Sequence, residues 1–413
     1  MVEPNRLGAK EAARLIERGE LTAEALVRSC LERIRVRDAD VRAWLCLNSD
    51  AGSRKAGGPL FGVPVGVKDI FDTYDMPTEY GSKIYAGHRP QSDSAAVALT
   101  RRAGGAILGK TVTTEFATMV PAQTRNPHDL ARTPGGSSSG SAAAVADFMV
   151  PLAFGTQTAG STIRPGSYCG VVAYKPTYNL LPRAGVKEGA DSLDTVSVFA
   201  RSVGDAAFFV RALTGLDVLE SKIDKPRVAI CRTYEWDHVR SEMRAALEQA
   251  GRTLSAPELE LPRSFKGLRE AQTAVLWYEV ARSLADEYTR FPDKIAPMLR
   301  ERCANGFAMD PMKYVAAQKL AAECRAQLED VMEGYDVLLA PAATGEAPLG
   351  LGSTGDVVMN AVWTLLHTPS VAVPASKSPN GMPLGLQVIG RIGDDGRTLA
   401  SAGWIASRLK EEL

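Results

Sequence analysis

Residues 133–146 read Thr-Pro-Gly-Gly-Ser-Ser-Ser-Gly-Ser-Ala-Ala-Ala-Val-Ala, and residues 155–165 read Gly-Thr-Gln-Thr-Ala-Gly-Ser-Thr-Ile-Arg-Pro. Two turns rich in Gly and Ser thus bracket a helix candidate of small residues and a short apolar run over 149–154. Glycine adopts backbone conformations that other residues resist, and it lets a ligand or another segment approach the main chain closely. A flexible Gly/Ser linker would not be followed by an apolar run able to enter a core. The two turns therefore indicate an ordered functional site.

The overall composition is that of an ordinary globular protein. The chain has 413 residues, of which 45% are hydrophobic and 23% charged, so it can build one large core or two smaller ones. Lys and Arg together number 48, as do Asp and Glu, and the formal net charge is zero. A neutral chain has no bulk electrostatic preference for nucleic acid or for an anionic membrane. We therefore expect neither as a partner.

Cysteine and histidine usage argues against several other classes. The six cysteines are scattered with no CxxC pair, and the four histidines show no HExxH spacing. Scattered thiols are typical of a reducing compartment, and metal sites normally show recognisable ligand spacing. The N-terminal residues lack an apolar leader, and no apolar run approaches the length of a membrane span. These patterns predict a cytoplasmic protein that uses no metal and no cofactor.

The flanks of the two turns alternate strand and helix patterns. Valines alternate with other residues over 62–70, which indicates a strand that ends at Lys68. Asp93 is expected to begin a helix that runs to Arg102, before two glycines and a buried strand at 106–108. Later helical patterns cover 241–250, 268–290 and 311–333, and strand patterns return at 336–340, 369–374 and 386–390. Strands on both sides of a helical stretch predict one α/β domain over residues 1–413, with a helical insertion at about 219–335.

A serine in either turn is a poor nucleophile until a base removes its proton. His128, in an Asn-Pro-His turn, is one candidate base for a Ser-His-Asp triad. Lysine is the other candidate, if burial or neighbouring charge lowers its pKa from about 10.4 toward neutrality. Lys68 suits that role because it ends a Val-rich strand, although a lysine at a strand end more often reaches solvent. The residues alone leave both bases open.

Several segments together resemble the amidase signature family. They are the segment around Lys68, the Gly-Gly-Ser-Ser-Ser-Gly-Ser core, the Gly-Ser-Thr-Ile-Arg-Pro sequel, Ala-Ile-Leu-Gly-Lys-Thr, Asp-Val-Leu-Leu-Ala-Pro and the late Pro-Leu-Gly-Leu-Gln-Val-Ile-Gly. The resemblance extends over most of the chain. It implies a mixed β-sheet core covered by helices on both faces, and an amidohydrolase that cleaves linear amide C–N bonds.

The resemblance also implies a Ser-Ser-Lys triad. Ser161 would be the nucleophile that attacks the amide carbonyl. Ser137, preceded by a cis peptide bond after Gly136, would be the bridging serine. Lys68 would be the neutral base that receives the proton and later returns it to the leaving nitrogen.

Further roles follow from the same resemblance. The second turn would form an oxyanion hole from the backbone N–H groups of Thr158, Ala159, Gly160 and Ser161, each donor being worth about 3–4 kcal/mol in the transition state. Among the remaining serines, Ser138 is expected to orient Lys68. Ser139 and Ser141 are expected to cap the helix that follows.

Differences between this sequence and the usual family pattern indicate which subtype to expect. Many members carry an acidic residue at the position of Gln157 and glycine at that of Ala159, and many place the arginine two residues after the nucleophile rather than three. The variant found here, with the compact chain, is most similar to malonamidase-type members, which act on small amides bearing a carboxylate. Arg164 is then a candidate substrate anchor, because guanidinium binds carboxylate bidentately. The alternative is that Arg164 belongs to a structural ion pair.

The leading expectation is an enzyme that cleaves a small linear amide, malonamate-like or carbamoyl, through an acyl-enzyme with release of ammonia. It would act as a homodimer on a small-molecule substrate. A second hypothesis is the amidase (A) component of a tRNA-dependent Asp/Glu amidotransferase, against which the neutral charge and the short middle region speak. A third hypothesis is a non-catalytic binding protein with the amidase fold.

Overall fold

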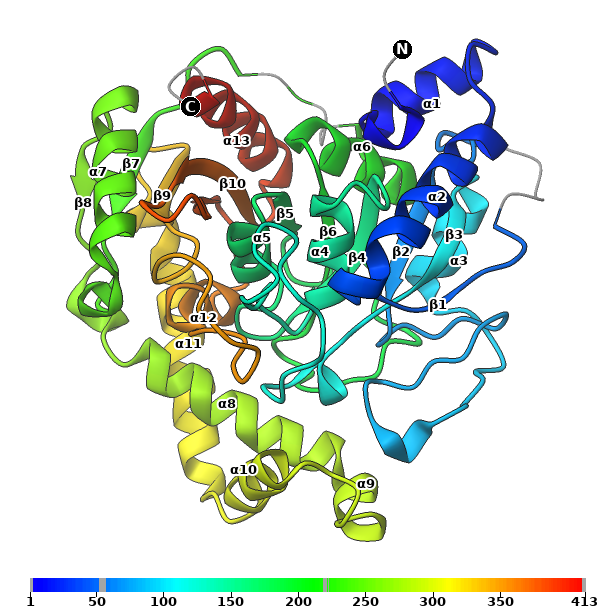
Figure 1. Ribbon diagram of the computed structural model, residues 1–413. Coiled ribbons are helices and arrows are strands. Elements are labelled where there is room, and N and C mark those ends of the chain that lie inside the picture. Colours follow the sequence, from blue (N-terminus) through cyan, green and yellow to red (C-terminus); the bar gives the residue numbers. More distant parts are fainter. Residues whose placement is uncertain (1–2, 52–56, 218–220, 222, 411–413) are drawn as a thin grey trace.

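One mixed sheet of eleven strands runs through the described part of the molecule (Figure 1). The structure is a computed structural model that describes residues 3–51, 57–217, 221 and 223–410. The strands lie in the order β1-β3-β2-β4-β6-β5-β10-β11-β9-β7-β8. They are β1 (Trp44–Leu47), β2 (Pro64–Lys68), β3 (Ala106–Thr111), β4 (Leu152–Gln157), β5 (Val172–Lys175), β6 (Thr195–Ala200), β7 (Val228–Cys231), β8 (Glu258–Leu259), β9 (Val337–Pro341), β10 (Ser370–Lys377) and β11 (Pro383–Ile389). The predicted α/β class with a mixed sheet is confirmed.

Helices cover both faces of the sheet, as predicted. On one face α3, α6, α7 and α13 contact the strands, and on the other face α4 and α5 do so, while α1 lies against α6. The helices are α1 (Ala9–Glu17), α2 (Ala23–Val41), α3 (Ala95–Arg102), α4 (Ser139–Ala146), α5 (Ile163–Cys169), α6 (Val203–Thr214), α7 (Ser241–Leu254), α8 (Leu268–Ser283), α9 (Ala285–Arg290), α10 (Pro297–Phe307), α11 (Pro311–Val331), α12 (Val358–Leu365) and α13 (Asp395–Lys410).

Three neighbouring parallel strands position the two Gly/Ser-rich turns. β2 pairs in parallel with β3 on one side and with β4 on the other. Parallel strands point their carboxyl ends to the same edge of a sheet, which is where open α/β sheets bind ligands. The end of β2 carries Lys68, the segment after β3 leads into the first turn, and the second turn follows β4 directly. The topology thus gathers three distant stretches of the chain at one edge.

The stretch predicted as a helical insertion contributes two strands to the main sheet. β7 pairs in parallel with β9, and the short β8 pairs with β7 at the sheet edge. Beyond these strands, α8 to α11 extend away from the sheet at the lower end of Figure 1, where α8 contacts α10, α11 and α12. Residues 218–220 and 222, next to the predicted start of the insertion, lie outside the described residues. The boundaries 219–335 therefore stay a prediction.

Two predicted helix boundaries differ from the structure. The single helix expected over 268–290 is divided at Leu284 into α8 and α9. The helix α3 has Ser94 at its N-cap position rather than Asp93. The carboxylate of Asp93 accepts hydrogen bonds from the Tyr74 N–H and from the Arg101 guanidinium instead. The prediction that Asp93 caps the helix was therefore wrong.

Three further findings bear on the class of protein: its helix lengths, its cysteines and its possible metal ligands. None of the described helices is both long and apolar enough to cross a membrane. All six cysteines are free, and five of them are buried. In the described ranges, no three His, Cys, Asp or Glu side chains gather as a group that could hold a metal ion.

Candidate active site

Lys68 lies at the buried end of β2 with its ammonium group between two hydroxyls. Its Nζ is 2.8 Å from Ser137 Oγ and 2.7 Å from Thr156 Oγ1. The side chain has no solvent exposure. Burial lowers the pKa of Lys68 to about 7, because desolvation penalises the charged form, while the nearby carboxylate of Asp194 acts in the opposite direction. Lys68 does not reach solvent, and its neutral form is accessible near neutral pH.

The first Gly/Ser-rich turn is fixed to the strands on both sides of Lys68. The peptide bond between Gly136 and Ser137 is cis, as predicted. The carbonyl of Ser137 accepts a hydrogen bond of 3.2 Å from the Thr114 N–H, after β3. On the other side, the Ser138 hydroxyl is 3.3 Å from both the N–H and the carbonyl oxygen of Thr156 in β4. These bonds hold the Ser137 hydroxyl beside Lys68.

The second turn, residues 158–161, has all its carbonyl groups engaged and its N–H groups unused. Ser161 is buried. Each carbonyl oxygen accepts a hydrogen bond, namely Thr158 from Gln272 Nε2, Ala159 from Thr364 Oγ1, Gly160 from the Arg164 N–H and Ser161 from the Ser138 N–H. Within the described part of the chain, no group accepts a hydrogen bond from the four N–H groups. Four backbone donors therefore remain available around Ser161.

Asp194 connects this turn to the environment of Lys68. Its carboxylate accepts a hydrogen bond of 2.5 Å from the Thr158 hydroxyl, and bonds of 2.7 and 3.1 Å from the N–H groups of Gly189 and Ala190. It also raises the pKa of Lys68 through its negative charge, against the larger effect of burial. One carboxylate thus fixes a side chain of the turn and acts electrostatically on the lysine.

Arg164, in α5, is buried, and two of its three guanidinium nitrogens have no hydrogen-bond partner among the described residues. Its Nη2 donates to the carbonyl oxygen of Gly136 at 2.7 Å and to Thr354 Oγ1 at 3.1 Å. Its Nε and Nη1 are buried and have no hydrogen-bond partner among the described residues. Burial lowers the pKa of Arg164, and Tyr168 and Asp356 partly oppose this effect. No carboxylate of the described chain lies within ion-pair distance of the guanidinium.

A cavity of about 590 Å³ lies against Ser161 and Arg164. Its lining includes the segments 116–119 and 353–357, six residues of α8 and Arg302 of α10. Its lining residues are Phe116, Ala117, Thr118, Met119, Thr158, Ala159, Ser161, Arg164, Gly189, Arg269, Gln272, Thr273, Leu276, Trp277, Val280, Arg302, Ser353, Thr354, Gly355, Asp356 and Val357. Ser161 and Arg164, far from α8 in the sequence, thus share one cavity with it.

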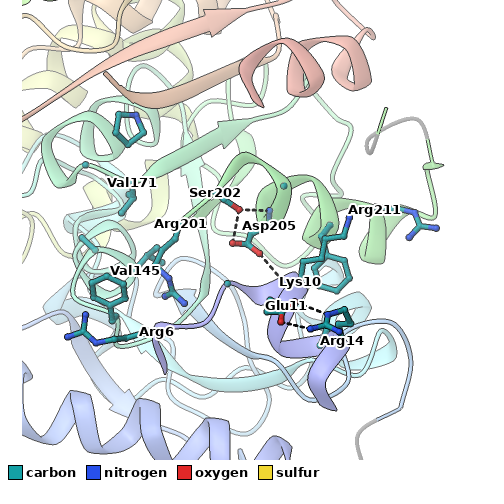
Figure 2. A pocket seen from close by; sticks show the side chains of 18 of the residues that line it. Arg6, Lys10, Glu11, Arg14, Val145, Val171, Arg201, Ser202, Asp205 and Arg211 are labelled. Atoms are coloured by element: carbon teal, nitrogen blue, oxygen red, sulfur yellow. Dashed lines mark hydrogen bonds and ion pairs between the residues drawn. The ribbon is translucent and has the colours of Figure 1, made fainter. Parts of the chain in front are cut away.

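A second, larger cavity of about 1100 Å³ lies between α1 and α6 (Figure 2), and of the candidate residues only His128 lines it. Several of its charged side chains are engaged with one another or with the main chain. Arg14 binds both carboxylate oxygens of Glu11, Asp205 accepts from Ser202 and from the Lys10 N–H, and Arg201 donates to the carbonyl of Val150. Its size alone does not make it the reaction site.

Other predicted roles are not supported by the contacts. His128, the alternative base, is hydrogen-bonded through Nε2 to the carbonyl oxygen of Cys169 and lines the larger cavity. The hydroxyls of Ser139 and Ser141 donate to the carbonyls of Val112 and Phe154, so neither caps α4. The prediction that they cap the helix was wrong because α4 begins at Ser139, so both serines lie within it.

Three residues of the site were not predicted. Thr156, Asp194 and Gln272 contact the lysine or the second turn, yet they come from β4, from the loop before β6 and from α8. Ser138, which was expected to orient Lys68, acts on Thr156 instead. The Thr156 position could have been found, because a strand next to β2 must present one side chain to Lys68. No signal in the sequence connects Asp194 or Gln272 to the turn.

Comparisons with known proteins identify similar sequences. The sequence model of the Amidase family matches residues 25–399. The A component of the glutamyl-tRNA(Gln) amidotransferase of Anaeromyxobacter sp. (strain K) is 33% identical, with 96% of this chain and 95% of that protein covered. That alignment spans 473 positions, more than the 413 residues of this chain, so the relative carries insertions that are missing here.

Solved structures show the same likeness. A crystal structure of an amidase is similar with a TM-score of 0.89 at 30% identity, covering 97% of this chain and 100% of that one. The structure of the corresponding glutamyl-tRNA(Gln) amidotransferase component from Thermotoga maritima gives a TM-score of 0.81 at 28% identity, with 97% and 94% covered. These relatives are amidotransferase components and an amidase, and the malonamidase-type subtype remains a prediction.

Proposed function

The chain belongs to the Amidase family and acts on amide C–N bonds, and from this premise we propose that it is a serine amidohydrolase working through an acyl-enzyme. The observation that carries the proposal is the contact of 2.8 Å between Lys68 Nζ and Ser137 Oγ at a site without solvent exposure. A neutral lysine there has a lone pair that can accept the Ser137 proton. Ser137 in turn takes the proton of Ser161, which becomes the nucleophile.

The reaction then follows from these groups. Ser161 Oγ forms a bond to the amide carbon while its proton passes through Ser137 to Lys68. The unused N–H groups at 158–161 stabilise the negative oxygen of the tetrahedral intermediate, where donors prearranged in a dry site are most effective. When the C–N bond breaks, the proton returns from Lys68 through Ser137 to the leaving nitrogen, and ammonia departs. Water attacks the acyl-enzyme by the same route and releases the acid.

The position of Arg164 favours a substrate that bears a carboxylate in addition to the amide. It lies on the cavity that contains Ser161, and two of its guanidinium nitrogens lack a partner among the described residues. Buried polar groups are rarely left without a partner, and a carboxylate accepts two guanidinium hydrogens in parallel. A small amide such as malonamate supplies that carboxylate next to the scissile group. We propose the carboxylate-bearing amide as the substrate class on this ground.

A second candidate is the A component of a tRNA-dependent amidotransferase. The observation in its favour is the name of the relatives, since components of that enzyme match over almost the whole chain. Glutamine, which carries both a primary amide and a carboxylate, would then be the donor of ammonia. This candidate shares the chemistry of Ser161 and differs in requiring partner proteins and a tRNA.

The test is ammonia release from malonamate, glutamine and malonamide by the purified chain. We expect malonamate to be preferred, Ser161→Ala and Ser137→Ala to abolish turnover, and Arg164→Gln to lower kcat/KM for malonamate much more than for neutral malonamide. Ser139→Ala is the matched control, because this serine of the same turn donates to Val112 and should keep its activity. Equal turnover of neutral and anionic amides would contradict the proposed preference for a carboxylate-bearing substrate.

The same preparation separates the remaining hypotheses. Glutamine hydrolysis that appears only with co-purified partner proteins would support the amidotransferase candidate. Failure of the wild type to react with a fluorophosphonate, which labels activated serines, would favour the non-catalytic hypothesis. Light scattering of the same sample tests the proposed homodimer.

A further inference from the structure

The cavity at Ser161 is larger and more cationic than a small amide requires. Its volume of about 590 Å³ lies in the range of sites that enclose drug-sized ligands. Three arginines line it, Arg164, Arg269 and Arg302, against one carboxylate, Asp356. That carboxylate accepts a hydrogen bond of 2.9 Å from the Val358 N–H at the start of α12. A monoanionic small amide would leave most of the space and part of the positive charge unused.

One wall of the cavity, here called the α8 wall, is a continuous face of α8. Arg269, Gln272, Leu276 and Val280 recur at the three- and four-residue spacing of a helix face, with Trp277 beside them. Gln272 is buried and donates to the carbonyl of Thr158, so this face is attached to the turn that contains Ser161. The wall therefore has a fixed position relative to the scissile bond.

Arg302 of α10 adds an uncompensated cation to this wall. Its guanidinium carbon lies 5.7 Å from the centre of the Trp277 ring. No carboxylate of the described residues forms an ion pair with it, whereas Arg269 lies 3.4 Å from Glu235. A cavity with a surplus of one sign of charge attracts ligands of the other sign. Of the two arginines beside the α8 wall, Arg269 and Arg302, only Arg302 is without an ion-pair partner among the described residues, and it is thus free to bind a ligand.

We propose that the substrate is an extended amide with a second anionic group at the end remote from the scissile bond, and that Arg302 beside Trp277 binds this group. The inference rests on the proposed function and names its substrate class more closely. The remote group lies along the α8 face and pairs with the Arg302 guanidinium. The substrate thereby fills the volume that malonamate leaves empty.

The experiment uses three probes and two arginine variants. The probes are malonamate and two 2-substituted malonamates with side chains of equal length, one ending in methyl and the other in carboxylate. Dissociation constants are measured by calorimetry in a Ser161→Ala background, and kcat/KM is measured in the background with Ser161 intact. Arg302→Gln is compared with Arg300→Gln, a control on the same helix that does not line the cavity. Because the binding readout needs no turnover, the inference can fail separately from the proposed function.

The carboxylate-ended probe is expected to bind about five- to tenfold more tightly than the methyl-ended probe, the size of one charge-assisted contact in a partly exposed place. Arg302→Gln should bring this ratio close to one, and Arg300→Gln should leave it unchanged. A ratio near one in the parent protein, or a ratio that survives Arg302→Gln, would overturn the inference. Absence of ammonia from every probe, with the binding ratio present, would overturn the proposed function alone.

Discussion

Lys68 determines the pH range of the proposed reaction. Burial lowers its pKa to about 7, and only the neutral amine can accept a proton. We expect kcat/KM to rise as the pH increases through about 7 and to be lost below that value, measured as initial rates of ammonia release. Asp194→Asn removes a negative charge that favours the ammonium form, so the midpoint should move to lower pH.

Lys175 is the control for this assignment. Burial also lowers the pKa of Lys175 to about 7, but its Nζ donates to the carbonyls of Pro176 and Thr368 and lies outside the cavity. Lys175→Met should therefore lower the stability and keep the pH midpoint of the rate. If the pH midpoint of the rate shifts in Lys175→Met and stays unchanged in Asp194→Asn, the role proposed for Lys68 is contradicted.

A substitution of Gly160 tests whether the second turn, residues 158–161, tolerates one additional methyl group. A Cβ at this position would lie 2.6 Å from Asn360 Oδ1, which belongs to a buried side chain held by the carbonyl of Ala342. Gly160→Ala must therefore displace the turn, and we expect kcat to fall by about 10²-fold or more, as when one oxyanion donor is lost. The double variant Gly160→Ala/Asn360→Ala should recover part of the rate. No recovery, with Asn360→Ala alone fully active, would show that another contact confines the turn.

At the scale of elements, α4 depends on a glycine where helices normally favour alanine. A Cβ at Gly140 would lie 2.3 Å from the Ala43 carbonyl oxygen and 2.4 Å from the Val112 nitrogen. The helix thus approaches the main chain after β3 more closely than any side chain allows. We expect Gly140→Ala to lower the free energy of unfolding by about 1–3 kcal/mol through overpacking, measured by urea denaturation.

Gly204 provides the matched control in α6. The nearest atom to a Cβ there is Ser202 Oγ at 3.8 Å. Gly204→Ala should be neutral or should stabilise the protein by up to about 1 kcal/mol, because alanine restricts the unfolded chain. Equal effects at the two positions would mean that helix propensity, rather than the close approach, dominates at Gly140.

Strong local patterns made some elements predictable and others not. The strand ending at Lys68 could be predicted from its alternating valines. β7 is a run of four residues buried on both faces, and periodicity cannot distinguish such a run from other apolar segments. β8 has two residues, which is too short for any periodic pattern. Every residue of α12 is buried, so the helix has no solvent-exposed polar face of the kind that marks a surface helix. The site residues missed, Asp194 and Gln272, depend on how these elements pack.

At the scale of the whole molecule, polar contacts attach the helices α8 and α9 to the loops around the site. Glu287 of α9 is buried, and its Oε1 lies 2.5 Å from Lys187 Nζ and 2.6 Å from the Tyr85 hydroxyl. Glu279 of α8 accepts from the hydroxyl and N–H of Ser192. The α8 wall of the cavity is therefore connected to the loop that carries Asp194.

Substitution of Glu287 tests this connection. Glu287→Gln should destabilise the protein by about 1–3 kcal/mol, since Lys187 is mostly buried and loses its charged partner. The KM for extended amides should rise as the α8 wall shifts. Asp286→Asn is the neighbouring control, because its pair with Arg290 is exposed and worth at most about 0.5 kcal/mol. Thermal unfolding measures the loss of stability in both variants, and steady-state rates measure the change in KM. If Glu287→Gln and Asp286→Asn have the same stability and the same KM, the connection is refuted.

The reacting groups come from residues 68–161, whereas the facing cavity wall comes from α8 and α10. During evolution a lineage can therefore replace the wall by substitution, insertion or deletion in one part of the gene while it inherits the bond-breaking apparatus unchanged. Descendants of one ancestor can in this way specialise on different amides. In the laboratory, the same separation makes chimaeras with exchanged α8–α10 segments a direct route to altered selectivity.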